Sequence, residues 1–316
     1  MAFFTGSKPT TGKEEQGKNV FYFGLVQKNV LVTGANGQLG SELKRNVPEG
    51  QNNFKYIFTD VDTLDITNPL QVEKFVEENN INYIINCAAY TAVDKAEDDI
   101  DLCYKINRDA VENLAKAASK CSAKLIHVST DYVFDGTKNT PYTESDATLP
   151  QSVYGKSKLE GEQVLMRHCP QSIVVRTAWL YSVYGNNFVK TMLRLGRERE
   201  ELNVVADQTG TPTNAGDLAR AIIKIVEFSE SNDFLSGIYH FSNLGVTTWY
   251  DFTRLIFEYA GYNDCKLNPI STEQYPTRAK RPQYSVLDKS KIISAFGIDI
   301  PEWEISLKKC IQELLQ

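Results

Sequence analysis

From Lys28 onward, short runs of β-branched and aromatic residues alternate with helical segments, and this alternation constrains the fold more than any other feature. Segments with helical spacing separate the runs, which lie at residues 29–34, 54–60, 81–90, 123–130 and 172–181. Apolar runs of this kind are typical of parallel strands whose sheet is covered by helices on both faces. The sequence therefore predicts an α/β fold with a Rossmann-type, doubly wound parallel sheet.

The alternation weakens after Tyr181, where the chain becomes mostly helical and its loops contain prolines, which predicts a smaller, mostly helical C-terminal substrate lobe. A chain of 316 residues is long enough for two units. We expect a dinucleotide-binding domain over residues 28–178 and about 203–243, and a substrate-binding lobe over about 179–202 and 244–316. Residues 1–27 lack the apolar block of a secretion signal, and we interpret them as an N-terminal extension.

The composition excludes several classes of function. A net charge of −6 indicates no basic surface for nucleic acid, and no stretch approaches the roughly 18 unbroken apolar residues of a membrane helix. The six cysteines form no CxxC pair, which fits a reducing cytoplasm. The three histidines lack metal-ligand spacing, and His127 is interpreted as a hydrogen-bonded core residue of a buried strand. We expect a cytoplasmic protein with neither a nucleic-acid nor a membrane partner.

A glycine-rich loop, TGANGQLG, joins the first predicted strand to the first helix and contains Gly34, Gly37 and Gly40. Glycines at these positions permit a tight turn, the approach of a pyrophosphate, and close packing of helix on strand. The N-terminus of the helix presents free N–H groups to the phosphates. Asp60 follows 20 residues after Gly40, at the end of the second strand, where a carboxylate can bind ribose hydroxyls. This spacing favours a dinucleotide site over an unliganded turn.

Tyr154 and Lys158 lie at positions i and i+4 of a predicted helix that opens with YGKSK. This spacing puts both side chains on one face, and a nearby ammonium is expected to lower the pKa of the tyrosine, making it a proton donor and acceptor. Such a pair alone is usually a solvent-exposed helix face. Here the preceding strand ends in Ser129, Thr130 and Asp131, at the carboxyl edge where ligands bind in open α/β sheets.

The glycine loop and YGKSK, taken with CAAYTAVDKAE (87–97) and STDYVFDG (129–136), resemble the extended short-chain dehydrogenase/reductase family. Further segments are similar to those of its dTDP-4-dehydrorhamnose reductases, namely RTAWLY (176–181), GNNFVKTML (185–193), DQTGTPT (207–213) and YPTRAKRP (275–282). The resemblance runs from about Lys28 to the C-terminus. It implies NAD(P)H-dependent reduction of the C4 keto group of dTDP-4-dehydro-β-L-rhamnose to dTDP-L-rhamnose.

The resemblance also implies roles for individual residues. Tyr154 would protonate the C4 oxygen of the sugar, and Lys158 would hold the nicotinamide ribose. Thr130, with Asp131 beside it, would hydrogen-bond the same substrate oxygen. Beyond Gly34 and Gly40, the cofactor contacts fall on Gly37, Gln38, Leu39, Asp60, Asp65, Ile66, Ala89, Tyr90 and Thr91. The indole of Trp179 would pack against the thymine or the sugar, although a tryptophan at a strand end also fits core packing. Apart from the resemblance, Arg281 is a candidate for contacting a diphosphate in the lobe cleft, although an exposed arginine beside prolines is the default interpretation.

An ionised Asp60 accepts hydrogen bonds from ribose hydroxyls and repels a 2′-phosphate. Asp62 follows it and no Arg or Lys lies between Asp60 and Lys74, so we expect NADH to be preferred over NADPH, although the family includes members that use both. Some members form dimers with Mg²⁺ bound by interface glutamates. These map onto Glu42, Glu198 and Glu304, which predicts a homodimer with a magnesium site, although each glutamate also fits a solvated helix surface.

Three alternatives have different sequence requirements. A 4,6-dehydratase of the same family resembles STDEVYG after the fourth strand and uses its Asp-Glu pair, whereas Tyr132 follows Asp131 here. An epimerase is harder to exclude, because it also needs only the tyrosine, the lysine and the cofactor. A non-catalytic subunit similar to the regulatory subunit of methionine adenosyltransferase could keep the fold and lose the catalytic set. The presence of Thr130, Tyr154 and Lys158 favours an enzyme.

Overall fold

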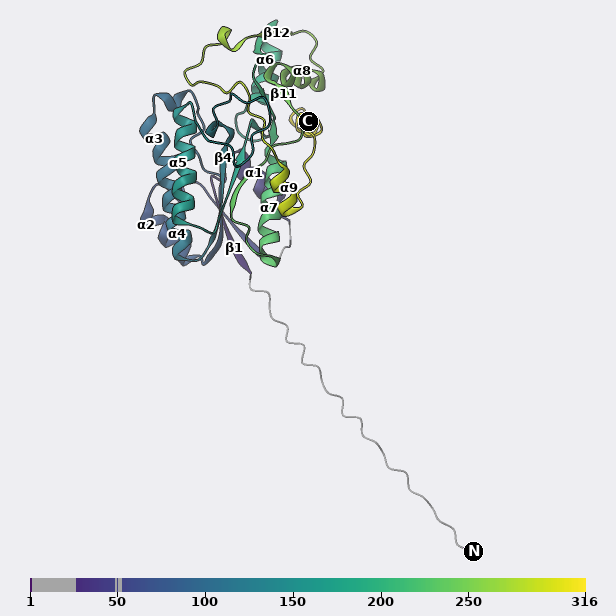
Figure 1. The fold of residues 1–316 in the computed structure, drawn as a ribbon. Coiled ribbons are helices and arrows are strands. Elements are labelled where there is room, and N and C mark those ends of the chain that lie inside the picture. Colours follow the sequence, from purple (N-terminus) through teal and green to yellow (C-terminus); the bar gives the residue numbers. More distant parts are fainter. Residues whose placement is uncertain (2–26, 49, 51–52) are drawn as a thin grey trace.

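The computed structural model describes Met1, residues 27–48, Gly50 and residues 53–316. The interpretation of residues 1–27 as an extension falls almost entirely outside this part. A central sheet of parallel strands has the order β10-β5-β4-β3-β1-β2 (Figure 1). Its strands are β1 (Lys28–Thr33), β2 (Phe54–Thr59), β3 (Ile81–Asn86), β4 (Lys124–Thr130), β5 (Ser172–Thr177) and β10 (Gly237–His240).

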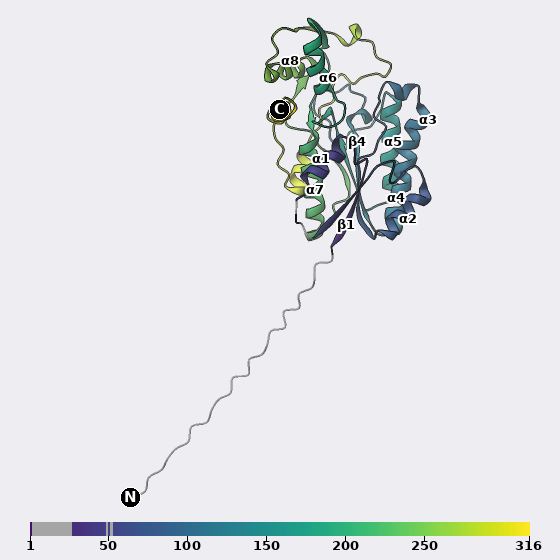
Figure 2. The ribbon, with the colours of Figure 1, turned by 180° about the vertical axis from the view of Figure 1, so that it is seen from behind.

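Helices cover both faces of the sheet, as Figures 1 and 2 show from opposite sides. One face carries α1 (Gln38–Asn46), α7 (Ala215–Ser231) and α9 (Ser290–Phe296), and the other α2 (Pro69–Glu78), α3 (Ile100–Tyr104), α4 (Ala110–Lys120) and α5 (Val153–His168). The doubly wound parallel sheet expected from the sequence is therefore confirmed. The chain adds β2 on one side of β1 and then β3 on the other side, so the order in which strands are added changes direction between β1 and β3. The carboxyl ends of β1 and β3 are therefore the topological switch point.

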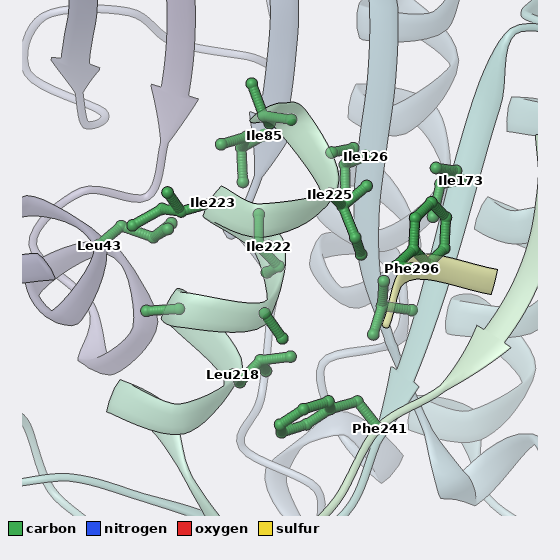
Figure 3. Packing of buried hydrophobic residues seen from close by; sticks show 14 of the residues in the cluster. Leu43, Ile85, Ile126, Ile173, Leu218, Ile222, Ile223, Ile225, Phe241 and Phe296 are labelled. Atoms are coloured by element: carbon green, nitrogen blue, oxygen red, sulfur yellow. The ribbon is translucent and has the colours of Figure 1, made fainter. Parts of the chain in front are cut away.

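The core under α7 illustrates why these segments form these elements. Leu218, Ile222 and Ile225 recur at helical spacing on α7 and are fully buried. They pack against branched side chains of the central strands, including Ile126 and Ile173 (Figure 3). Strands buried on both faces need such residues at nearly every position, which is why their sequences read as continuous apolar runs.

A smaller lobe lies at one end of the sheet, where Figure 1 shows α6 and α8 above the strands. Its helices are α6 (Phe188–Glu198), α8 (Trp249–Ala260) and α10 (Trp303–Leu314). Phe252, Ile256 and Leu307 are fully buried in its own core. Three two-stranded pairs complete it: β6 (Leu180–Tyr181) with β9 (Thr213–Asn214), β7 (Glu201–Val205) with β12 (Lys266–Ile270), and β8 (Thr209–Gly210) with β11 (Thr247–Thr248).

The structure differs from the predicted boundaries in two places. Residues 203–205 belong to β7, which pairs with β12 of the lobe, and residues 209–210 and 213–214 form β8 and β9, which also pair outside the central sheet. Conversely, Ile292 and Phe296 of α9 are buried in the core that covers the sheet, although the residues after 244 were all expected in the lobe. Both differences have one cause: a short apolar pattern shows that a segment is buried but not which partner buries it.

Three predicted elements are also interrupted. The strand expected over 172–181 divides into β5 and β6, of which only β5 belongs to the central sheet. The strand expected over 81–90 ends at Asn86, and residues 87–90 form a loop. The helical segment expected between the runs at 81–90 and 123–130 consists of α3, a π-helical segment η2 (Lys105–Asp109) and α4. Short 3₁₀ turns occur at η1 (Lys95–Glu97), η3 (Asp131–Val133) and η4 (Thr272–Gln274). Within the described residues, no helix has the length and apolar character needed to cross a membrane.

Candidate active site

The glycine loop lies at the switch point. Gly34 follows β1 with φ of +66°, and a Cβ atom there would come within 2.7 Å of the backbone of Ala88, just after β3. A Cβ atom on Gly40, in the first turn of α1, would lie 2.4 Å from the carbonyl oxygen of Gly34. These two glycines let the turn, the helix and the neighbouring strand end pack closely. Around a Cβ atom on Gly37, only the Gly34 carbonyl oxygen lies within 4 Å among the described residues, at 3.3 Å.

The N-terminus of α1 has the properties of a phosphate site. Its N-cap is Gly37, so no side chain caps the first turn, whereas Asn68 and Ser152 cap α2 and α5. The first N–H groups of a helix have no intrahelical partner, and the helix dipole adds a partial positive charge. An uncapped N-terminus beside glycines therefore fits the pyrophosphate of a dinucleotide.

Asp60, directly after β2, is fixed beside the glycine loop. Its Oδ2 accepts from the N–H of Asn36 at 2.9 Å and its Oδ1 accepts from the N–H of Val61 at 2.8 Å. Each carboxylate oxygen keeps a second lone pair, so the group can still accept from ribose hydroxyls. The backbone thus holds Asp60 where the sequence motif requires it.

The other predicted cofactor residues lie around the ends of β2 and β3. Asp65 accepts from the hydroxyl and the N–H of Thr67, which lower the pKa of its carboxyl, so this side chain already holds the turn before α2. Leu39 and Ile66 are buried core residues, which leaves their backbone for a cofactor contact. The remaining members of the set, Ala89, Tyr90 and Thr91, form the loop after β3. Gln38 Oε1 accepts from Asn187 at the N-cap of α6, which joins the glycine loop to the lobe.

Tyr154 and Thr130 meet where α5 passes the end of β4. Tyr154 is only 9% exposed, and its ring packs edge-on against Tyr132 with centroids 5.5 Å apart. Burial raises the pKa of Tyr154 above its usual value, and the hydrogen bond with Thr130 lowers it by less. The expectation that Lys158 makes the phenol unusually acidic is therefore wrong for this structure. Tyr154 is instead a protonated phenol at neutral pH, which is the state that a proton donor requires.

Lys158 is buried beside β4. Its Nζ donates to the carbonyl of Val128 at 2.7 Å and lies 3.1 Å from Nε2 of His127. Burial lowers the pKa of Lys158 to about 8. Tyr154 and Lys158 are both on the buried face of α5, as their spacing predicts, but the lysine nitrogen bonds to β4.

Asp131 is a buried carboxyl next to these groups. Its Oδ1 accepts from the Thr130 hydroxyl at 2.9 Å, while its Oδ2 has no hydrogen-bond partner in the described part of the protein. Burial raises the pKa of Asp131 to about 6, and the nearby hydroxyls of Thr130 and Ser285 limit the rise. An unpartnered buried acceptor is costly and is a common mark of a functional site.

Arg281 reaches this centre through Tyr132. Its guanidinium donates to the Tyr132 hydroxyl at 3.0 Å and pairs with Asp94 at 2.5 Å. Tyr132 in turn packs against the Tyr154 ring. Arg281, predicted to contact the substrate, thus already has two protein partners. Through Tyr132 it also supports the ring of Tyr154, the candidate proton donor.

Trp179 lies at the junction with the lobe. Its φ of +47° is uncommon for a residue with a side chain, and its indole stacks on Trp249 with centroids 3.5 Å apart and planes within 11°. Both indoles are partly exposed. Trp249 was not singled out from the sequence, because nothing in its local pattern distinguishes it from a core residue at the start of a helix.

The three candidate magnesium ligands do not form a site within one chain. Glu42 is buried and accepts from the Ser182 hydroxyl at 2.6 Å, and Glu198 pairs with Arg194 on its own helix. Glu304 lies in the first turn of α10. Among the described residues no three His, Cys, Asp or Glu side chains are grouped to hold a metal ion.

Sequence reasoning missed the polar residues that support the site. Asn107, in the π-helical segment η2, accepts from the N–H of Tyr90 at 2.8 Å and donates to the Ser157 hydroxyl at 3.1 Å. Asn86 and His127 lie behind Lys158. The adjacency of Ser157 to Lys158 in YGKSK was a signal that could have pointed to Ser157. Asn86 and Asn107 lie in other segments and are found only from their contacts.

The comparison with protein families decides the identity of this site. The model of the RmlD substrate binding domain matches residues 28–316, which is the whole described fold. A dTDP-4-dehydrorhamnose reductase of Aggregatibacter actinomycetemcomitans is 46% identical over 286 residues, covering 88% of this chain and 97% of the relative. The chain belongs to the dTDP-4-dehydrorhamnose reductase family.

Solved structures of this reductase family agree with the assignment. The reductase of Clostridium acetobutylicum superposes with a TM-score of 0.85 at 48% identity, covering 91% of this chain and 100% of that one. The reductase of Bacillus anthracis, solved in complex with NADP, gives a TM-score of 0.86 at 42% identity with the same coverage. The family resemblance read from the segments around the glycine loop and YGKSK is therefore confirmed.

Proposed function

We propose that this protein uses NAD(P)H to reduce the C4 keto group of dTDP-4-dehydro-β-L-rhamnose to dTDP-L-rhamnose. The observation that carries the proposal is a buried, protonated Tyr154 in contact with Thr130, on the same helix face as Lys158. These groups lie at the sheet edge that the uncapped glycine loop also occupies. Family membership supports the same reaction, since the relatives carry the name of this reductase.

Each residue has a task that follows from its surroundings. The bound cofactor would supply a hydride to C4. Tyr154 would donate its proton to the C4 oxygen, which gains negative charge as the carbonyl is reduced. The single hydroxyl proton of Thr130 is donated to Asp131 in this structure, and it would turn to the C4 oxygen when the substrate binds. Lys158 would hold the nicotinamide ribose, and the stacked indoles of Trp179 and Trp249 offer a flat surface for thymine or the sugar.

The proposal includes a preference for NADH over NADPH. Asp60 supports this preference. The backbone N–H groups of Asn36 and Val61 hold its carboxylate at the end of β2. A fixed negative charge accepts from ribose hydroxyls and repels a 2′-phosphate. The Bacillus anthracis relative was solved with NADP, so a relative of this fold accepts the phosphorylated cofactor.

The reaction is tested directly by supplying purified protein with dTDP-4-dehydro-L-rhamnose and following the loss of NADH or NADPH absorbance. Substrate-dependent oxidation supports the reductase. A protein that binds the cofactor without oxidising it would instead support the regulatory-subunit alternative. Formation of an epimer without net cofactor consumption would support an epimerase. Elimination of water is disfavoured, because Tyr132 stands where a dehydratase has its second carboxylate.

A cytoplasmic homodimer completes the proposal. The six cysteines are free, which suits a reducing compartment. A magnesium site at Glu42, Glu198 and Glu304 would need ligands from a second copy, because one chain does not group them. Sedimentation with and without EDTA separates the possibilities. A monomer in both conditions eliminates the dimer, and a dimer that persists in EDTA eliminates an essential metal.

A further inference from the structure

Trp179 has a strained backbone where the chain passes from the sheet to the lobe. Asn80, Ser122 and Trp179 are the described residues other than glycine that have positive φ. Asn80 and Ser122 lie in turns, where small polar side chains are common, whereas a bulky side chain makes the φ of +47° at Trp179 a true outlier. Strain of this kind persists only where the surrounding structure holds it, and it is frequent at ligand-binding sites.

Thr213 of β9 holds the main chain at this point. The carbonyl of Trp179 accepts from the N–H of Thr213 at 3.1 Å, and the Thr213 hydroxyl donates to the carbonyl of Ala178 at 2.6 Å. Both residues that connect β5 to β6 are therefore fixed through their carbonyl groups. Neither hydrogen bond restrains the side-chain torsions of Trp179, so the orientation of its indole must be fixed by packing.

The β8–β11 pair supplies two contacts to the indole of Trp179. Gly210 of β8 pairs with Thr247 of β11, and Trp249 is the first residue of α8, directly after β11. The ring of Trp249 stacks on that of Trp179. A Cβ atom on Gly210 would lie 2.6 Å from Cε2 and Cζ2 of Trp179, so only glycine lets the β8 backbone lie this close to the indole. One pair of strands therefore places both groups against the ring.

The stack of Trp179 on Trp249 is imposed by the structure around it. Its planes lie within 11° and its centroids are 3.5 Å apart, whereas aromatic pairs prefer offset or edge-on arrangements with centroids about 4.5–7 Å apart. Trp249 is itself held in place. Thr248 caps the first turn of α8, and the ring of Phe188, at the start of α6, packs on the Trp249 indole with centroids 4.5 Å apart. Trp249 is therefore a fixed support for the Trp179 ring.

We propose that Trp249 is a positioning residue, which holds the indole of Trp179 against the Gly210 backbone in the orientation that the nucleotide-sugar substrate meets. The left-handed backbone directs the side chain, and the stack excludes its other rotamers. The surface is thereby formed before the substrate arrives, so binding does not have to fix this side chain. The identity of the ligand rests on the proposed function, whereas the restraint of Trp179 is a property of the chain alone.

The decisive measurement is the freedom of the Trp179 indole. The chain has three tryptophans, so Trp179 is the only one left when Trp303→Phe is combined with Trp249→Leu or with Trp249→Phe. Leucine removes the stacking ring, whereas phenylalanine keeps a flat ring. Time-resolved fluorescence anisotropy without ligand should show a nanosecond motion of Trp179 in the Trp249→Leu protein and not in the Trp249→Phe protein. A Trp179 indole that stays immobile in the Trp249→Leu protein would overturn the proposal.

The effect on substrate binding separates support of Trp179 from direct contact with the substrate. In Trp249→Leu, KM for the nucleotide sugar should rise by about tenfold, the scale of one aromatic pair, while kcat and NADH affinity change little. Trp249→Phe should recover most of this loss. Phe257→Leu is the matched control and should leave KM unchanged, since it removes a ring of α8 that packs on Tyr262 in the lobe core. A raised KM with an immobile Trp179, or a mobile Trp179 with an unchanged KM, contradicts the proposal.

A failure of the proposed function is distinguishable from a failure of this inference. The freedom of Trp179 is measured without cofactor or substrate, so a negative reductase assay leaves that result unaffected. If Trp249→Leu does not fold, the unaltered protein still decides the proposal. Stacked indoles shift one another's ring protons upfield in NMR spectra, and Trp179→Phe identifies the signals of Trp179. Ring-proton signals of Trp179 at their usual positions would overturn the proposal.

Discussion

Arg281 and Asp94, 187 positions apart in the chain, form an ion pair of 2.5 Å that ties the loop before residue 282 to the loop after β3. The same guanidinium donates to Tyr132, whose ring packs on Tyr154. The pair therefore fixes one wall of the candidate site from two distant segments. Its stabilising effect on folding is expected to be small, because Asp94 is 43% exposed.

Arg281→Met should accordingly lower kcat/KM by about tenfold, the scale of one lost hydrogen bond to a charged group, while changing the free energy of unfolding by less than about 1 kcal/mol. Arg278→Met is the matched control, since Arg278 pairs with Asp98 in the same region, whereas the hydrogen bond to Tyr132 in the described part of the chain comes from Arg281. Steady-state kinetics and urea unfolding of both variants test this. Equal losses of kcat/KM in the two variants would remove the role given to Tyr132.

Two glycines of the phosphate loop should respond differently to alanine. Gly34→Ala places a Cβ atom 2.7 Å from backbone and needs a left-handed residue, so it should destabilise the fold by at least about 1 kcal/mol. Gly37→Ala meets a single close contact, the Gly34 carbonyl oxygen at 3.3 Å, and needs no left-handed backbone, so it should destabilise the fold less than Gly34→Ala. Its methyl group would nevertheless occupy the approach of the pyrophosphate and weaken NADH binding at least about tenfold. Thermal unfolding and cofactor titration distinguish the two. Unchanged NADH affinity in Gly37→Ala would argue against a phosphate site here.

Tyr154→Phe removes the proton donor and keeps the ring against Tyr132. Turnover should fall by at least about a hundredfold, the usual scale of general acid catalysis, with cofactor affinity nearly unchanged. Stopped-flow reduction and NADH titration measure the two effects separately. Near-normal turnover in a folded variant would mean that another group protonates the sugar.

Asp60→Ser should shift cofactor choice towards NADPH. Serine still accepts from a ribose hydroxyl but carries no charge to repel a 2′-phosphate. The ratio of kcat/KM for NADH to kcat/KM for NADPH should exceed one in the unaltered protein. In Asp60→Ser this ratio should fall by about tenfold, the scale expected for loss of a hydrogen bond to a charged group. Asp62→Ser is the control, because Asp62 is exposed and accepts no hydrogen bond from the glycine loop. A ratio below one before any substitution refutes the charge argument.

Asp131 should make the fold less stable as the pH rises. Burial raises its pKa from 3.8 to about 6, so the folded state binds this proton more tightly than the unfolded chain does. The protonated Asp131 carboxyl therefore makes its full favourable contribution to the free energy of unfolding below about pH 4, and this contribution is lost as the pH rises through 6. Asp131→Asn should remove this dependence and stabilise the protein at pH 7.5, but not at pH 4, by up to about 3 kcal/mol. Urea unfolding at both pH values measures it, and an equal effect at both would exclude a shifted carboxyl.

The parts of this protein that the sequence predicts are those determined by nearby residues. The apolar runs predict the strands, the glycine spacing predicts the turn at Gly34, and the interval between Tyr154 and Lys158 predicts a shared helix face. The pairing of β7 with β12 depends on a partner some 60 residues away, and the contact of His127 with Lys158 depends on the register of β4 against α5. The acidity of Tyr154 was mispredicted because burial outweighs its neighbours.

The chain passes repeatedly between the sheet domain and the lobe. It leaves the sheet after β5, returns in α7, enters the lobe in α8, returns in α9 and ends in the lobe in α10. Neither part is a continuous segment, so no single cut releases a lobe with its own complete core. Limited proteolysis should therefore yield nicked protein that stays associated until both parts unfold together, and any opening of the lobe must bend several connections at once.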